Sequence, residues 1–423
     1  MTTTRNRIAV CAALSVLTAG ALATGCGSAS DQPSPKQRKT PSEAVPHGYV
    51  EGAQETAEQQ PRLVVADGDT GAVQVLDLTT GDITPTARVE GVREIVGDGR
   101  FAYLHTTDRT HVVDTGAWMV DHGDHVHYYR ARIRDVGEVP GAQPKQVNSD
   151  TARTAVAFGD GSVGLLDRAA LDGGTIRRVA TVTDGTLPGP AVPYREHLLT
   201  PALAPDGGTV VAVRGKDGVR DGAIAEPCPE LRGVAVTRKG VVFGCADGAL
   251  LVTEKGGTFA GEKIAYGRPV AAENRAHDFH HRPGSTTLAA RAGAEGAWLL
   301  DVARRTWTLV PTGPVVAVNT AADGAPLLAL TDDGVLKAYD ARTGAETART
   351  ALLSAPVRSS GPAAAGAGTE NARPPVIEID SGRAYVNDAA TRKIHEIDYG
   401  DDLRVARTFS LPLTPTHMVE TGR

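Results

Sequence analysis

The sequence predicts an all-β fold, a β-propeller of seven or eight four-stranded blades, and three observations lead to it. A unit of about 40 residues recurs along the chain, each with four apolar runs closed by turns such as Asp-Gly and Thr-Gly. The 48 glycines suit tight turns. Hydrophobic residues make up 41% of the chain and aromatic residues only 4%, which suits short Val/Ala/Leu strands. Four short strands per unit are typical of a propeller blade. A pair of β-sandwiches, the alternative, would need less regular spacing.

The repeats define the extent of the propeller, which we expect over residues 61–423. The clearest copies begin at Leu63, Thr154, Gly233, Thr286, Pro326 and Pro375. The first unit, near residues 62–92, lacks an innermost strand. Residues 417–420 at the C-terminus would supply this strand and close the ring. We expect the protein to be a monomer.

Residues 1–25 have the features of a lipoprotein signal peptide. Arg5 and Arg7 precede an apolar stretch, and small residues lead directly to Cys26. Cys26 would then become the first mature residue, carry the lipid and anchor the protein to the outer side of the cell membrane. Cleavage as an ordinary signal peptide is the alternative. Residues 26–60 are rich in Ser, Pro and polar residues, which predicts a disordered, flexible tether between lipid and propeller.

Two cysteines remain once the signal peptide and the lipid site are set aside. These are Cys228 and Cys245. In an oxidising compartment a disulfide is the default for such a pair. A two-cysteine metal site is the alternative, although no Cys-x-x-Cys spacing supports it.

The overall charge and the absence of enzyme motifs narrow the function. The net charge of -6 gives no basic surface, so we expect no nucleic-acid partner. The chain has no Gly-x-Ser-x-Gly elbow, Walker loop or His-Glu-x-x-His motif. Its many Asp and Glu residues fall in turns, where they ordinarily cap the turn. We therefore predict a protein that is not an enzyme; a lyase or hydrolase acting at the channel mouth ranks third among the hypotheses.

One stretch, from Asp121 to Tyr129, stands apart from the repeat because three of the 12 histidines fall within six residues. They are His122, His125 and His127. We expect residues 125–127 to begin the fourth strand of the second unit. His125 and His127 would then share a face, with His122 returning across the turn.

Three imidazoles at this spacing predict a metal site. They suit Zn²⁺ best, with copper or nickel as alternatives. Asp121 and Asp124 would be fourth ligands, or acceptors for the imidazole N–H groups. The alternative is a solvated polar turn that is merely rich in histidine.

A second candidate cluster involves the inner strands, which line the central channel of a propeller. Its members are His277, His280, His281 and His417. His280 and His281 should face opposite sides of a regular strand, so only one of them would join a shared site. The alternative is a set of polar residues lining a wet channel.

Three segments resemble the periplasmic zinc metallochaperones called AztD. They are "CPELRGVAVTRKGVVFGCADGALLV" from Cys228, "DHGDHVHYYR" from Asp121 and "ARPPVIEIDSGRAYVNDAATRKIHEID" from Ala372. The resemblance implies a propeller that carries Zn²⁺ as cargo to the solute-binding protein of an ABC-type zinc importer. It also implies a Cys228–Cys245 disulfide between neighbouring strands. Two residues depart from the family pattern, because Arg232 and Val234 stand where a histidine and an acid are expected.

These observations support two hypotheses of different kinds. The first is an extracytoplasmic, lipid-anchored protein that binds Zn²⁺ and passes it on. The second is a non-catalytic interaction propeller that has lost its metal, which Arg232 and Val234 favour because a fixed cation cannot ligate Zn²⁺.

Overall fold

The computed structural model describes residues 49–122, 125–322, 324–355 and 374–423. The chain divides into two compact units, Met1–Pro46 and His47–Arg423, and every described residue belongs to the second. The predicted signal peptide, Cys26 and the tether as far as residue 48 lie outside the described residues. Among the described residues, no helix has the length and apolarity needed to cross a membrane.

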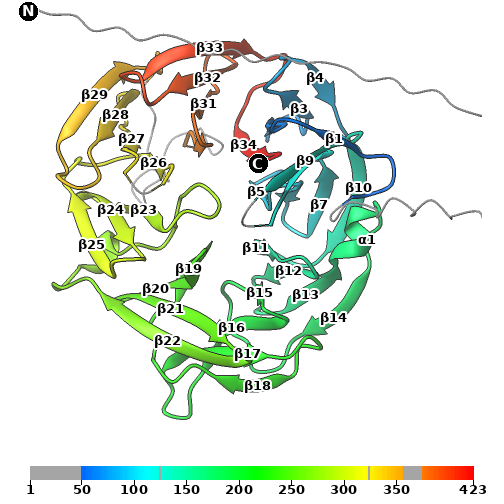
Figure 1. The fold of residues 1–423 in the computed structure, drawn as a ribbon, viewed down its shortest axis with the longest axis vertical. Coiled ribbons are helices and arrows are strands. Elements are labelled where there is room, and N and C mark those ends of the chain that lie inside the picture. Colours follow the sequence, from blue (N-terminus) through cyan, green and yellow to red (C-terminus); the bar gives the residue numbers. More distant parts are fainter. Residues whose placement is uncertain (1–48, 123–124, 323, 356–373) are drawn as a thin grey trace, which may run out of the picture. The chain divides into compact units, whose positions relative to one another are not determined.

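Eight antiparallel sheets within the second unit form the blades of a propeller (Figure 1). Within each blade, the strands are ordered from the innermost outwards. The first four blades are β34 (His417–Thr421), β2 (Arg62–Ala66), β3 (Val73–Asp77) and β4 (Ile83–Pro85); β5 (Glu94–Gly97), β6 (Phe101–His105), β7 (Arg109–Asp114) and β10 (Arg134–Pro140); β11 (Pro144–Ser149), β12 (Arg153–Phe158), β13 (Val163–Asp167) and β14 (Arg178–Val182); and β15 (Val192–Tyr194), β16 (His197–Leu203), β17 (Thr209–Arg214) and β18 (Arg220–Ala223).

The remaining four blades continue in chain order. They are β19 (Arg232–Thr237), β20 (Gly240–Cys245), β21 (Gly248–Lys255) and β22 (Thr258–Ala265); β23 (Thr287–Ala292), β24 (Gly296–Asp301) and β25 (Thr306–Val310); β26 (Ala317–Thr320), β27 (Leu327–Leu330), β28 (Val335–Tyr339) and β29 (Glu346–Ala351); and β30 (Ile377–Ile379), β31 (Ala384–Asp388), β32 (Lys393–Asp398) and β33 (Arg404–Ser410). Two short helices, α1 (Arg168–Asp172) and η1 (Ala272–Asn274), lie between strands. The predicted all-β propeller is confirmed, with eight blades.

The first blade closes in the way the sequence predicts. β34 pairs antiparallel with β2, from Ala66 opposite His417 to Arg62 opposite Thr421. The C-terminal strand thus becomes the innermost strand of the N-terminal blade. Because this pairing joins the two ends of the propeller, it removes the exposed sheet edges that an open blade would leave.

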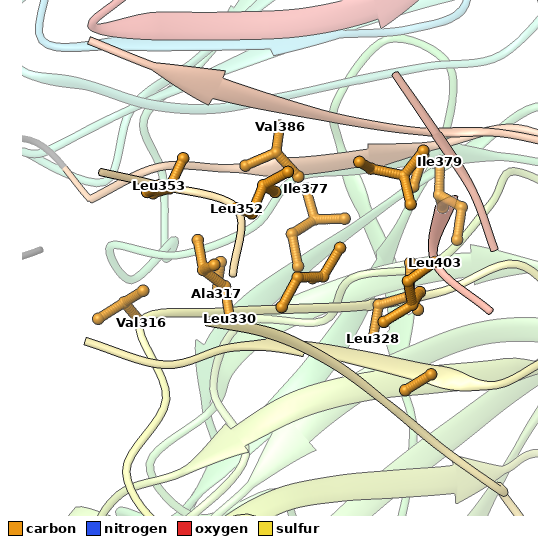
Figure 2. Packing of buried hydrophobic residues seen from close by; sticks show 14 of the residues in the cluster. Val316, Ala317, Leu328, Leu330, Leu352, Leu353, Ile377, Ile379, Val386 and Leu403 are labelled. Carbon is orange, nitrogen blue, oxygen red and sulfur yellow. The ribbon is translucent and has the colours of Figure 1, made fainter. Parts of the chain in front are cut away.

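The core lies between neighbouring blades. Both faces of a blade are covered, so its strands read as continuous apolar runs; every residue of β2 is buried. Figure 2 shows one cluster, in which Leu328 and Leu330 of the seventh blade face Ile377 and Val386 of the eighth. Burying one such aliphatic side chain stabilises the fold by roughly 1.5–3 kcal/mol. Packing between blades therefore holds the ring together.

The second blade differs from the prediction at its fourth strand. That strand is β10, whereas β8 (Ala117–Asp121) and β9 (Val126–Arg130) form a hairpin inserted before it. Gly116 turns the chain out of the blade with a φ of 67°, and a Cβ there would lie 2.4 Å from the Ala131 carbonyl oxygen. The expectation that residues 125–127 begin the fourth strand is therefore wrong. The hairpin belongs to a separate three-stranded sheet.

The third strand of that sheet comes from the end of the expected tether. β1 (Gln54–Thr56) pairs antiparallel with β9, with Glu55 opposite Tyr129 and Thr56 opposite Tyr128. The strand is short and polar, so its sequence carries no burial pattern; the unpaired edge of β9 supplies its hydrogen-bond partners. Ordered structure therefore begins before residue 61.

A disulfide joins Cys228 to Cys245, with the two Cα atoms 5.0 Å apart. Both residues are fully buried, in an apolar cluster shared by the fourth and fifth blades. The predicted disulfide is confirmed. It ties the segment before β19 to the end of β20 and leaves neither sulfur as a thiolate ligand.

Candidate metal site

The β8–β9 hairpin brings together three histidines. The ring centroid of His125 lies 4.9 Å from those of both His122 and His127, and the remaining pair is 5.3 Å apart. One ligating atom from each residue lies within 4.8 Å of the others. Among the described residues, this is the one group of three or more His, Cys, Asp or Glu side chains that could hold a metal ion. His122 and His125 are exposed and His127 is half-buried, so the group opens to solvent.

The local fold explains why the three rings converge. The backbone N–H of His122 donates to the carbonyl of His125 at 3.0 Å, which closes the turn between β8 and β9. His127 lies one residue into β9, opposite Val120. The convergence thus comes from a hairpin turn, in which neighbouring side chains need not alternate between faces. A tetrahedral zinc ion with Zn–N distances of about 2.0–2.1 Å would require the three nitrogens to approach to roughly 3.4 Å of one another, a closure of up to about 1.4 Å.

An aromatic stack attaches the hairpin to the second blade. The Arg100 guanidinium lies 3.9 Å from the centroid of the Trp118 ring, and Trp118 stacks on Tyr129 at 5.3 Å. The Tyr129 ring in turn lies nearly parallel to that of His127, at 6.3 Å. The base of the hairpin is therefore fixed, even though His122 and His125 are exposed.

Arg100 is itself held by a buried ion pair. Its Nε and Nη2 donate to the two carboxylate oxygens of Asp114 at 3.0 and 2.8 Å, and Arg134 donates to the same carboxylate. Burial alone would raise the pKa of Asp114, but hydrogen bonds and charge from Arg100, with a hydrogen bond from Arg134, outweigh burial and hold that pKa below its ordinary value. The carboxylate is thus charged at neutral pH and keeps Arg100 beneath Trp118.

A carboxylate absent from the sequence prediction also contacts the cluster. Glu55 on β1 lies with Oε1 2.6 Å from Nδ1 of His127. The prediction missed Glu55 because residues 26–60 carry the composition of a flexible tether. Strand pairing between residues 72 positions apart leaves no local signal in such a segment.

The two predicted aspartates are not placed in the metal cluster with the histidines. The Asp121 carboxylate lies 3.5 Å from the Arg238 guanidinium on the β19–β20 turn and is not part of the group of converging ligand atoms. Asp124 lies outside the described residues. A role for either as the fourth ligand remains a prediction.

The second predicted cluster does not come together as one group of ligands. His280 makes a single bridge to Ala289 of β23, His281 lies 3.4 Å from the Val236 carbonyl of β19, and His417 begins β34. Within the described part of the chain, these residues and His277 do not form a group with metal-ligand spacing. Burial and the nearby Arg232 lower the pKa of His277, which favours its neutral form but places a fixed cation beside it. The structure therefore brings the first cluster together and leaves the second apart.

Comparisons with known proteins agree with the fold and with the predicted resemblance. No family model matches the chain. The chain is 30% identical over 210 residues to the zinc chaperone AztD of Citrobacter koseri; these residues are 46% of this chain and 48% of the relative. This chain thus spans about half the length of that curated relative.

Solved structures extend the likeness beyond that stretch. The crystal structure of Citrobacter koseri AztD superimposes with a TM-score of 0.71 at 22% identity, over 86% of this chain and 98% of that one. The structure of apo AztD from the same organism gives a TM-score of 0.70 at 20% identity with the same coverage. The resemblance to the AztD family is confirmed. At these identities, the likeness to the AztD crystal structures shows a shared fold.

Proposed function

We propose that this protein is a zinc-binding metallochaperone, which takes up Zn²⁺ at His122, His125 and His127. The observation that carries the proposal is the convergence of these three imidazoles, with ligating atoms within 4.8 Å of one another. Neutral imidazole nitrogens are preferred Zn²⁺ ligands, and three of them leave a fourth coordination position open. The similarity to a zinc chaperone supports the choice of zinc over copper or nickel.

The exposure of the site favours cargo over a structural ion. A structural zinc site is closed by four protein ligands. In this hairpin two of the three imidazoles are exposed, while the Trp118–Tyr129 stack anchors its base. An acceptor protein could therefore approach the ion and exchange ligands with it. We propose that the acceptor is the solute-binding protein of an ABC-type zinc importer, and that the chaperone is not an enzyme.

The proposed location is the outer face of the cell membrane. Cys26 would carry the lipid, and residues up to the start of the described chain would form the tether. The signal-peptide features of residues 1–25 and the Cys228–Cys245 disulfide support an oxidising, extracytoplasmic compartment.

Zinc binding to the purified full chain tests the proposal. We expect about one Zn²⁺ per chain by calorimetry near neutral pH, and no binding after replacing His125 and His127 together by Ala. The matched control replaces His277 and His281 by Ala and should bind zinc like the parent. Absence of zinc binding by the parent protein, or unchanged binding by the first double variant, would contradict the proposal.

The competing function is a non-catalytic interaction propeller that has lost its metal. Arg232 favours it, because its charge lies close to His277 and no lone pair is available from a guanidinium. The neighbouring genes distinguish the two functions. Genes for a zinc-importer permease, ATPase and binding protein beside this one support the chaperone, and their absence supports the scaffold.

A further inference from the structure

The contact between Glu55 and His127 joins the metal cluster to a part of the chain that precedes the propeller. The carboxylate oxygen Oε1 lies 2.6 Å from Nδ1. A carboxylate accepts hydrogen bonds and cannot donate them, so Nδ1 of His127 carries the hydrogen. The lone pair of the ring is then at Nε2, and this atom is left to bind a metal.

Two neighbours therefore set the orientation of His127. Tyr129 stacks nearly parallel to the ring, at 22°, and fixes its plane. Glu55 bonds one edge of the ring and fixes which nitrogen faces away. Backbone pairing of β1 with β9 holds Glu55 in place, since Glu55 lies directly opposite Tyr129 in the register.

We propose that Glu55 is a positioning residue for zinc uptake, which acts through His127 by fixing the tautomer that presents Nε2 to the ion. This inference rests on the proposed function, because it assumes that the three histidines bind zinc. Glu55 is not itself a ligand: among the described residues, the group with metal-ligand spacing holds the three histidines and not Glu55. Carboxylate acceptors of this kind typically change metal affinity by about 10–100-fold.

The proposal gives β1 a function. The strand has three residues, two of them exposed, so burial of apolar side chains does not account for its docking. Its pairing with β9 instead delivers a carboxylate to the metal cluster. The zinc site of this protein would then consist of the hairpin and the short strand that precedes the propeller, and truncation of the chain at residue 61 would remove a working part of the site.

Substitutions at Glu55 test this inference in the purified full chain. Glu55→Ala removes the acceptor and should weaken Zn²⁺ binding about 10–100-fold in a chelator competition assay. Glu55→Gln keeps an amide oxygen that accepts from Nδ1–H, so it should lose less affinity than Glu55→Ala. The matched control is Glu58→Ala, which removes the same charge from an exposed side chain three residues away. It should change the affinity by less than about twofold, because the hydrogen bonds described for Glu58 are accepted from Thr56 and Gln60 by its backbone carbonyl, whereas the Glu55 carboxylate contacts His127.

A spectroscopic readout separates positioning from general electrostatics. Nitrogen-15 NMR of the imidazole without zinc should show His127 as the Nδ1–H tautomer in the parent and in Glu58→Ala, and a mixture of tautomers in Glu55→Ala. Three outcomes would overturn the inference while His125→Ala still abolishes binding: parental affinity in Glu55→Ala, an unchanged tautomer in Glu55→Ala, or a loss as complete as that of His127→Ala, which would make Glu55 a ligand. If His125→Ala and His127→Ala also bind like the parent, the proposed function itself fails.

Discussion

The two histidine clusters contain similar residues and differ in how the chain presents them. His122, His125 and His127 lie on one hairpin turn, where a few residues of chain bring three rings within 5.3 Å of one another. His280 and His281 lie in the segment before β23, whereas His417 begins β34 of another blade, and the ring of sheets fixes the spacing between those blades. A turn added to the propeller can converge on an ion without altering the blades. Inner strands can bind one ion only if the side chains from each blade lie at the same position along the channel axis.

The electrostatic surroundings of the two clusters differ as well. The hairpin cluster has a carboxylate, Glu55, bonded to one of its imidazoles. The inner-strand histidines lie near fixed cations: Arg232 lowers the pKa of His277, and Arg423 contributes to the lowered pKa of His281, both beyond the effect of burial. A zinc ion would be attracted to the first setting and repelled by the second.

The largest expected effect comes from removing the support of the hairpin. Arg100→Leu would leave the buried Asp114 carboxylate with Arg134 as its remaining cation and remove the guanidinium beneath Trp118. Breaking one partner of a buried ion pair costs about 3–5 kcal/mol, and we expect the lower end because Arg134 remains. Urea denaturation measures the loss, and calorimetry on the folded variant should show weaker zinc binding.

A matched substitution in the other region completes this test. Arg423 likewise contacts two acidic side chains, at 2.5 Å from Glu420 and 3.0 Å from Glu378. Arg423→Leu should therefore also destabilise the fold, yet leave zinc affinity unchanged. Equal losses of zinc affinity in both variants would show that the hairpin depends on global stability and not on its own anchor.

The propeller and its closing strand follow from the sequence because their signals are local. Continuous apolar runs between Gly and Asp turns define the blades, and residues 417–421 have the pattern of the strand that the first unit lacks. The three-histidine cluster was likewise visible as spacing within one short segment. The hairpin was not, because residues 125–127 follow three strand-like runs and therefore read as the start of the fourth strand. In the structure, the turn at Gly116 and the ion pair between Asp114 and Arg134 show why β10 is the fourth strand of the second blade.

The contribution of Glu55 could not be predicted for a different reason. The pairing of β1 with β9 joins residues far apart in the chain, and the polar residues of β1 are the same types that make a tether flexible. The separation of the second cluster could not be predicted either. The sequence gives the order of the blades, but not the position of each side chain along the channel.

An intermediate effect is expected from the buried carboxyl of the first blade. Glu420 is 1% exposed, and burial, with Asp380 and Glu378 nearby, raises its pKa to about 8 despite Arg423. The folded protein then holds a proton that the unfolded chain releases above its ordinary pKa of 4.5, so stability falls as pH rises from about 4.5 to about 8. Glu420→Gln has no carboxyl group at this position, so its stability lacks this dependence on pH. Its free energy of unfolding, relative to the parent, should improve by on the order of 2 kcal/mol between about pH 6.5 and about pH 8.5, while zinc binding stays parental. An unchanged difference between the two proteins across this range would refute the assignment.

The smallest effect should come from neutralising the cation beside His277. Arg232→Met keeps much of the length of the side chain and removes its charge, so the pKa of His277 should move back toward its ordinary value, and NMR titration of the imidazole would measure the shift. Arg275→Met is the control, because Arg275 contributes less to the same lowering. We expect zinc stoichiometry to stay at about one per chain, since among the described residues His277 belongs to no group of three or more side chains that could hold a metal ion. A second bound zinc would show that charge, and not the dispersal of ligands over the blades, is what prevents the inner cluster from binding metal.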